Sequence, residues 1–341
     1  MIPYWLSRPP LWHVLCGQRG EIQKDAIIGD DLRIDLGVAL SVFAVVERKD
    51  QMDLFGAVAL IAFALNLAFN QVVISVTNGG FSPVFQAGVR SAGAVLVLLI
   101  WMRLRGVGFH VPRAAWLGGI ISGLLFSLEF MCLFSALDLT TVSRASVIFY
   151  TMPVWLALIA HVFFPGERLT GPKTIGLILA MAGVAIALAD RSGGKVSWTG
   201  DLLALTSSLC WAGIVVCVRL TPLAKVPPAQ QLMFQVLISA PILLILAPLF
   251  GPLIRDVAPI HVAGLLFQII AVASLGFLAW FWLMSIYPSS SVASFSFLSP
   301  VFSVLLGWIL LSENVAPSVW GALVLVASGI YLINRKPRVP A

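Results

Sequence analysis

The sequence contains few charged residues, few histidines and few cysteines. Only 11% of its 341 residues are charged, and it has four histidines and four cysteines. A soluble domain carries about 25% charged residues, so this composition excludes a water-exposed surface around most of the chain. The cysteines, at Cys16, Cys132, Cys210 and Cys217, show no metal-ligand spacing. The net charge of +6 does not indicate nucleic-acid binding, because the charges stand in short segments between apolar runs.

Motifs for phosphate binding and nucleophilic catalysis are also missing. The stretch 166–174 superficially resembles a phosphate-binding loop, but Pro172 intrudes between Gly171 and Lys173, and the stretch joins two apolar segments rather than a strand and a helix. No nucleophile elbow and no metal cluster is recognisable in the sequence. We therefore expect no metal, no cofactor and no enzymatic activity. A membrane-embedded enzyme is the alternative of another class, and it would need more than one acidic residue in the middle of the spans.

Long apolar segments make up most of the chain instead. Hydrophobic residues account for 60% of the sequence, and the mean hydropathy is +1.00. A helix needs about 20 apolar residues to cross the hydrocarbon core of a bilayer. The predicted fold class is therefore an all-α integral membrane protein with ten transmembrane helices. The predicted spans are residues 54–76, 83–101, 115–137, 141–164, 174–189, 202–218, 231–249, 261–286, 289–311 and 318–333.

Both ends of the chain lie outside these spans. Residues 1–53 are predicted to be a cytoplasmic extension, because the apolar stretch 37–46 is too short to cross a bilayer and no cleavable signal is recognisable. The alternative is that the native chain starts at Met52. Lys and Arg are concentrated in the segments on the side of the termini. We therefore predict a bacterial inner-membrane protein with both termini, including the tail 335–341, in the cytoplasm.

The second half of the chain repeats the first half. The repeat pairs Gly56 with Gly200, Pro153 with Pro300, Glu167 with Glu313 and Gly183 with Gly329, at offsets of 144 to 147 residues. Each copy has five spans, an odd number, so the two copies must lie in the membrane in opposite orientations. Inverted repeats of this kind are typical of carriers that alternate their access between two sides. We predict one repeat over residues 54–189 and the other over residues 200–334.

Two prolines stand at equivalent places in the fourth and ninth predicted spans. A proline inside a helix removes a backbone hydrogen bond and kinks the helix. In a membrane, such a break is tolerated only where it faces protein or water. We predict that Pro153 and Pro300 bend helices that line a central cavity. The alternative is a static kink with no role in transport.

Several short motifs accompany the repeat. They are Gly-Glu-Arg-Leu-Thr at 166–170, Leu-Ser-Glu-Asn at 311–314, Arg90, Trp211 and the run from Thr141 to Pro153. Together they resemble the drug/metabolite transporter superfamily, in particular its EamA-type members with ten helices, over about residues 54–334. The resemblance implies a secondary transporter of small metabolites, in particular an exporter of amino acids or related compounds. The alternative is a carrier or flippase for a sugar-linked or lipid-linked substrate.

Three ionisable residues, Arg90, Glu129 and Arg144, lie inside predicted spans of the first repeat. Such groups cost about 2.5–3.5 kcal/mol on insertion scales and are candidates for function. We expect Glu129 to pair with Arg90 or with Arg144. Glu129 then either exchanges a proton or binds a cationic group, or the pair only ties helices together. The second repeat has no acid at the matching place, near Leu275, which favours a functional role.

Four further residues are predicted to line the substrate path. Asn66 and Asn70 are four residues apart and share a helix face, and Tyr150 and Trp211 are the aromatic candidates. The expected partners are a small-molecule substrate and the lipid bilayer. Protons and a second copy of the chain in a homodimer are further candidates, and nucleic acid is not expected.

The two glutamates of the repeat stand at the edges of the membrane. Glu167 follows the fourth predicted span and Glu313 follows the ninth, so the inverted topology places them on opposite sides. We predict that both are loop or capping residues rather than ligands.

Overall fold

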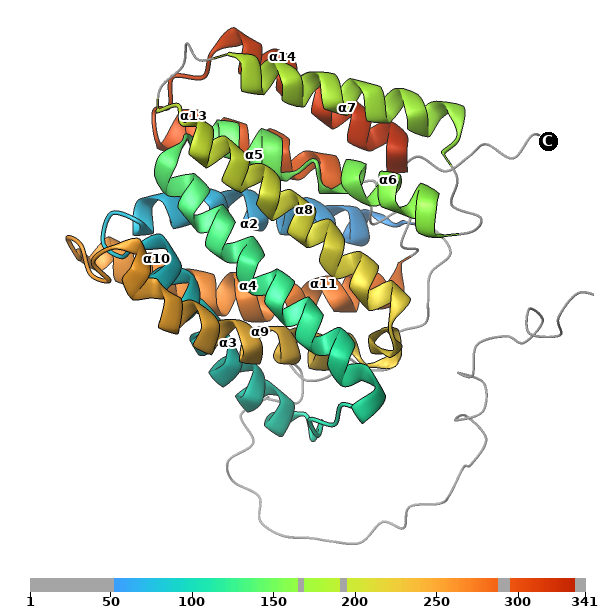
Figure 1. Ribbon diagram of the computed structural model, residues 1–341, viewed down its shortest axis with the longest axis vertical. Coiled ribbons are helices and arrows are strands. Elements are labelled where there is room, and N and C mark those ends of the chain that lie inside the picture. Colours follow the sequence, from blue (N-terminus) through green and yellow to red (C-terminus); the bar gives the residue numbers. More distant parts are fainter. Residues whose placement is uncertain (1–51, 165–168, 191–194, 288–294, 335–341) are drawn as a thin grey trace, which may run out of the picture. The chain divides into compact units, whose positions relative to one another are not determined.

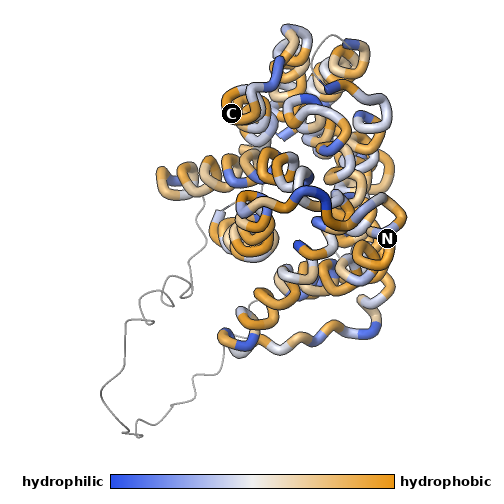
Figure 2. The backbone as a smooth tube through the Cα atoms, turned by 90° about the vertical axis from the view of Figure 1, so that its left-hand side faces the viewer, coloured by the Kyte–Doolittle hydropathy of each residue, from blue (hydrophilic) through white to orange (hydrophobic). Residues whose placement is uncertain are grey.

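The computed structural model describes residues 52–164, 169–190, 195–287 and 295–334. Its helices in these ranges are α2 (Leu54–Thr77), α3 (Pro83–Leu104), η2 (Arg113–Ala115), α4 (Trp116–Leu139), α5 (Val142–Phe149), α6 (Met152–Phe163), α7 (Gly171–Ala189), α8 (Trp198–Leu220), η3 (Pro222–Lys225), α9 (Pro228–Leu246), η4 (Ala247–Phe250), α10 (Pro259–Phe267), η5 (Gln268–Ser274), α11 (Leu275–Ile286), η6 (Phe295–Phe297), α13 (Leu298–Leu310) and α14 (Pro317–Asn334). Within the described ranges, nine helical stretches are long and apolar enough to cross a membrane, and α13 is a shorter apolar helix. The predicted all-helical, multi-pass membrane class is confirmed, and Figure 2 shows apolar residues along most of these helices.

Several helices continue past the predicted spans at their charged ends. α3 runs on to Leu104, α7 begins at Gly171 rather than at residue 174, and α8 begins at Trp198 rather than at residue 202. The added turns contain charged side chains such as Lys173. Long cationic side chains extend their head groups toward water while their stems cover apolar surface, so hydropathy alone ends such helices too early.

The last helices of the two repeats, α7 and α14, cross at the glycines that mark the repeat. A methyl group added at Gly183 would lie 2.8 Å from the carbonyl oxygen of Ala322, and one added at Gly329 would lie 2.5 Å from the carbonyl oxygen of Gly176. The two contacts are related by the repeat offset of 146 residues, which matches Gly183 with Gly329 and Gly176 with Ala322. Small residues allow such close backbone approach in membranes. The crossing therefore follows the internal symmetry of the chain.

The first helices of the two repeats, α2 and α8, begin at a second symmetric contact. A methyl group added at Gly56 would collide with the ring of Tyr287, just after α11, and one added at Gly200 would lie 3.1 Å from the Cβ of Thr140, just after α4. Tyr287 and Thr140 are again repeat counterparts, 147 residues apart. Two independent pairs of contacts thus agree with the arrangement as two repeats.

The helices are arranged in layers, as Figure 1 shows. α7 and α14 pack together at one edge, and α3 packs on α9 at the opposite edge. The helices α2, α4, α5, α6, α8 and α11 lie between these edges. A large buried apolar cluster joins the middle of the molecule, with Phe134, Ile148 and Met233 among its fully buried members. These central helices position the candidate site.

Two of the central membrane segments are interrupted. The fourth segment breaks at Tyr150 and Thr151, between α5 and α6, and Pro153 stands in the first turn of α6. The eighth segment contains the π-helical stretch η5 between α10 and α11. A π-helical turn inserts an extra residue into a helix and is frequent at functional sites. The second interruption was not predicted, because no proline marks it in the sequence.

Candidate functional site

A cavity of about 560 Å³ lies between the central helices. Its aromatic lining residues are Phe63, Phe126, Phe130, Phe149, Tyr150, Trp211, Phe277, Trp280, Phe281 and Phe295. Its polar and charged lining residues are Asn70, Gln71, Arg90, Glu129, Tyr150, Arg219, Gln231, Gln235 and Ser299. An apolar cavity of this size with a few polar groups is typical of a small-molecule site.

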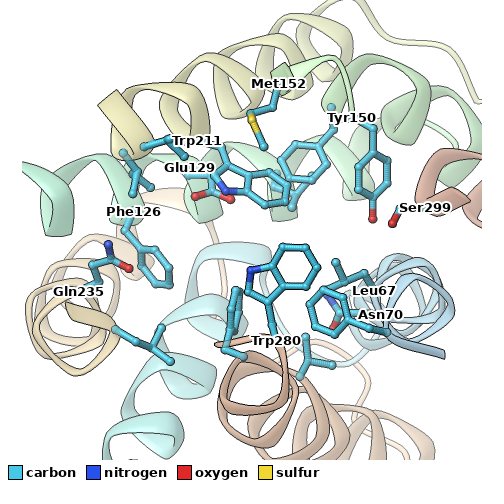
Figure 3. Close-up of a pocket in the computed structure, with 18 of the residues that line it drawn as sticks. Leu67, Asn70, Phe126, Glu129, Tyr150, Met152, Trp211, Gln235, Trp280 and Ser299 are labelled. Carbon is cyan, nitrogen blue, oxygen red and sulfur yellow. The ribbon is translucent and has the colours of Figure 1, made fainter. Parts of the chain in front are cut away.

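Two stacked aromatic pairs form opposite walls of the cavity. Trp211 stacks on Phe149 with ring centroids 5.1 Å apart and an interplanar angle of 23°, and Trp280 stacks on Phe63 at 4.8 Å and 21°. Figure 3 shows the two tryptophans facing each other across the open space. Because each ring is supported by its stacking partner, the walls present flat, fixed faces. Such faces suit an aromatic or apolar group of a ligand.

Glu129 and Arg90 are the buried charges in the cavity wall. Glu129 is 4% exposed and Arg90 is 3% exposed, and their charges interact electrostatically. The expected pairing of Glu129 with Arg90 is therefore electrostatic, because among the described residues the two form no ion pair within 4.0 Å. The guanidinium of Arg90 instead lies over the ring of Phe130, 4.2 Å from its centroid. A negative and a positive group thus line the same cavity without neutralising each other in a direct contact.

Arg144 lies outside this cavity, in a different ion pair. Its Nε and Nη2 donate hydrogen bonds to the Asp201 carboxylate at 2.7 and 2.9 Å, and its Nη1 donates one to the Asp190 carbonyl oxygen at 2.7 Å. The predicted pairing of Arg144 with Glu129 is therefore wrong. Asp201 was missed as a partner because it stands one residue outside the predicted sixth span, whereas α8 begins three residues earlier than Asp201. The pair ties α5 to α8.

Asn66 and Asn70 have different surroundings despite their spacing. Asn70 is buried in the cavity wall, whereas Asn66 donates a hydrogen bond at 3.1 Å to the carbonyl oxygen of Ala271 in η5. In this π-helical stretch the N–H of Leu275 bonds five residues back, to Ile270, and therefore leaves the Ala271 carbonyl to Asn66. Asn66 therefore does not line the cavity in this structure, because the interrupted helix supplies a backbone acceptor for its side chain.

The other predicted site residues divide between the cavity and its surroundings. Tyr150, Trp211 and Pro153 line the cavity, and Pro300 is buried in the first turn of α13 without lining it. The hydroxyl of Tyr150 points toward Ser299, as Figure 3 shows.

Two residues of the cavity wall were not among the predicted site residues. Trp280 forms part of one aromatic wall, and Gln235 donates a hydrogen bond at 2.6 Å to the Ser122 hydroxyl. Gln235 stands 145 residues after Arg90 and is its counterpart in the second repeat. That offset is the signal in the sequence that points to it.

The cavity extends toward the end of the bundle where the described chain begins and ends. Its lining there includes Arg219 at the end of α8, Gln231 at the start of α9 and Met284 at the end of α11. At the opposite end, the Arg255 guanidinium bonds both oxygens of Asp138, at 2.8 and 2.9 Å. These hydrogen bonds raise the pKa of Arg255 above its ordinary value. The pair joins the loop before α10 to the end of α4 and thus connects the two repeats.

Glu313 makes a second connection between the repeats at this opposite end. Its carboxylate accepts hydrogen bonds from the backbone N–H groups of Val142 and Ser143, at 2.6 and 2.9 Å. The prediction that Glu313 is a capping residue is confirmed. Its counterpart Glu167 lies outside the described residues.

Membrane-spanning helices in two inverted repeats around a central cavity define the class of protein as a membrane carrier. The model of the EamA-like transporter family matches residues 54–189 and 198–335. The chain belongs to this family, which is part of the drug/metabolite transporter superfamily. It is a transporter with a small-molecule substrate.

Several known proteins are similar to this chain. The uncharacterized transporter YvbV of Bacillus subtilis is 31% identical over 262 residues, which cover 75% of this chain and 84% of that protein. The uncharacterized inner membrane transporter YedA of Escherichia coli K12 is 27% identical, over 85% of this chain and 96% of that protein. The aromatic amino acid exporter YddG of Ancylobacter novellus is 31% identical over 40% of this chain and 47% of that protein. One crystal structure, 23% identical, matches 81% of this chain and 96% of that chain with a TM-score of 0.59, which shows a shared fold.

Proposed function

We propose that this transporter exports amino acids or closely related amphipathic metabolites from the cytoplasm. The observation that carries the proposal is the composition of the cavity wall, which combines Glu129, Arg90 and two facing aromatic walls. The similarity to an aromatic amino acid exporter, over 40% of this chain, supports the same substrate class.

The cavity wall is complementary to a zwitterion with an apolar side chain. A substrate ammonium matches the Glu129 carboxylate, and a substrate carboxylate matches the Arg90 guanidinium, whose Nε has no hydrogen-bond partner among the described residues. Buried charges are costly unless they are paired. A ligand that supplies both opposite charges therefore stabilises the site more than a neutral or singly charged ligand does. The side chain of the substrate then lies between Trp211 and Trp280.

We further propose that Glu129 couples transport to protons. It is the only acidic residue among the described lining residues, so a proton and a substrate ammonium compete for the same carboxylate. Such competition gives exchange of proton for substrate, because the site releases one when it binds the other. The proposed location is the bacterial inner membrane with both termini in the cytoplasm, and a homodimer stays a prediction.

The proposal is tested by counterflow of labelled phenylalanine, leucine and glutamate in proteoliposomes at several pH values. Glu129→Gln removes the carboxylate charge, and we expect a loss of transport of about tenfold or more, since a hydrogen bond to a charged group contributes roughly 1.5–3 kcal/mol. We also expect the remaining transport to lose its pH dependence. The matched control is Asp256→Asn, which removes an exposed acid outside the cavity lining and should leave transport unchanged.

Two outcomes contradict the proposal. If Glu129→Gln transports substrate with an unchanged pH profile, Glu129 does not couple transport to protons. Absence of transport of every amino acid by a correctly folded wild-type protein would remove the substrate class.

A further inference from the structure

Glu313 holds the first turn of a helix that belongs to the other repeat. Besides the two backbone N–H groups of α5, its carboxylate accepts a hydrogen bond from the Ser143 hydroxyl at 2.6 Å. The first N–H groups of a helix have no partner inside the helix, and the helix dipole favours an anion at this end. A single side chain between α13 and α14 therefore satisfies three donors of α5. We call this set of contacts the Glu313 cap.

Two neighbouring residues are adapted to the Glu313 cap. Ser312 has φ of 52°, in the left-handed region that residues other than glycine rarely adopt. Gly307 lies against the carboxylate, and a methyl group there would lie 2.6 Å from Glu313 Oε2 and 2.9 Å from the Ser143 hydroxyl oxygen. Backbone strain persists only where the surrounding structure enforces it, and it is frequent in switch regions. The strained backbone at Ser312 and the absence of a side chain at Gly307 thus both permit the contact of the Glu313 carboxylate with α5.

The helix α5 connects the Glu313 cap to the cavity. α5 has eight residues and ends at the break before α6, where Phe149 and Tyr150 line the cavity. At about 1.5 Å per residue, Ser143 lies about 10 Å along the helix from Tyr150. The cavity itself extends toward the other end of the bundle, where Arg219 and Met284 line it. The cap therefore lies beyond the closed end of the cavity, on the helix whose last residues form the cavity wall.

We propose that the Glu313 cap closes the cavity on the side away from the start of α2 and the end of α14, and that its release opens the cavity to that side. This inference rests on the proposed function, because it requires that the cavity opens alternately to two sides. When the cap is released, α5 is free to move relative to α13 and carries Phe149 and Tyr150 with it. Closure of this end and the shape of the substrate cavity therefore change together.

The inference is tested with a cysteine reporter in the cavity. The reporter is Met152→Cys, a wall residue, in full-length protein whose native cysteines are replaced by alanine. A membrane-impermeant thiol reagent is applied to right-side-out and to inside-out membrane vesicles, and the labelling rate is measured from each side. The assay needs no substrate, so an error in the proposed substrate class leaves its result valid.

Three variants test the Glu313 cap, two by disrupting it and one by relieving the strain next to it. Glu313→Gln removes the negative charge, and Gly307→Ala displaces an intact carboxylate. Ser312→Gly relieves the backbone strain and keeps the cap. The matched control is Asn314→Ala, which changes the next residue, an exposed one whose side chain makes no hydrogen bond to the other described residues.

Wild-type protein is expected to label from the side on which α2 begins and α14 ends. Glu313→Gln and Gly307→Ala should raise labelling from the opposite side by about tenfold or more, because hydrogen bonds to a charged group are lost. Ser312→Gly should label from that side no faster than the wild type, and Asn314→Ala should match the wild type. Unchanged labelling in folded Glu313→Gln and Gly307→Ala, or an equal rise in Asn314→Ala, would overturn the inference. If either Glu313→Gln or Gly307→Ala does not fold, the labelling of the other variant tests the inference. If neither folds, Glu313→Asp, whose side chain is shorter, is used instead.

Discussion

The buried ion pair between Arg144 and Asp201 leads to a prediction about stability. Asp201→Asn removes the charge that faces the Arg144 guanidinium and leaves the shape of the side chain nearly unchanged. The two side chains are 3% and 0% exposed, so water cannot replace the lost partner. Removal of one member of a buried pair costs about 3–5 kcal/mol, because the other charge stays buried without compensation. We expect Asp201→Asn to lower the free energy of unfolding by this amount.

The pair between Arg255 and Asp138 is the matched control. Its distances are similar, at 2.8 and 2.9 Å, but its side chains are 32% and 23% exposed. Exposed pairs contribute about 0.2–1 kcal/mol, so Asp138→Asn should have a much smaller effect. The measurement is equilibrium unfolding of both variants in mixed detergent micelles with increasing denaturing detergent.

A double replacement tests whether the loss of stability comes from leaving one buried charge without its partner. In Arg144→Met with Asp201→Leu, both charges are gone, and apolar side chains in place of a buried pair are often neutral or stabilising. The double variant should therefore be more stable than Asp201→Asn alone. Equal losses for Asp201→Asn and Asp138→Asn, or a loss below about 1 kcal/mol for Asp201→Asn, would refute the reasoning that burial sets the magnitude.

Two further predictions concern packing and the π-helical stretch. Gly329→Val inserts a side chain at the crossing of α14 with α7 and should destabilise the protein by about 1–3 kcal/mol, whereas Gly321→Val, on the same helix with open space around it, should have little effect in the same unfolding assay. Asn66→Leu leaves the Ala271 carbonyl without its hydrogen-bond donor and should cost about 1–3 kcal/mol. Because Asn66 lies outside the cavity lining, the substrate KM should stay unchanged, and a large rise in KM with normal stability would contradict this assignment.

Much of the fold can be predicted from the sequence because it follows from local composition. Apolar segments of membrane-spanning length and an odd number of them in each repeat lead to the class and to the inverted arrangement. The repeat glycines Gly183 and Gly329 lie at the crossing of α7 and α14 that the structure shows. Tyr150 and Trp211, both predicted for the path, line the cavity.

Only the tertiary structure decided which groups meet. Arg144 bonds Asp201, 57 residues further along the chain, and Asn66 bonds Ala271, 205 residues further along. Spacing within one helix predicts which residues share a face, but it does not specify which neighbouring helix covers that face. The π-helical stretch shifts the register of its helix and frees one carbonyl group, and no single residue type signals this shift. The sequence alone therefore determined the spans and their symmetry, which depend on the bilayer, while the partners of the buried charges and amides depend on helix packing across the two repeats.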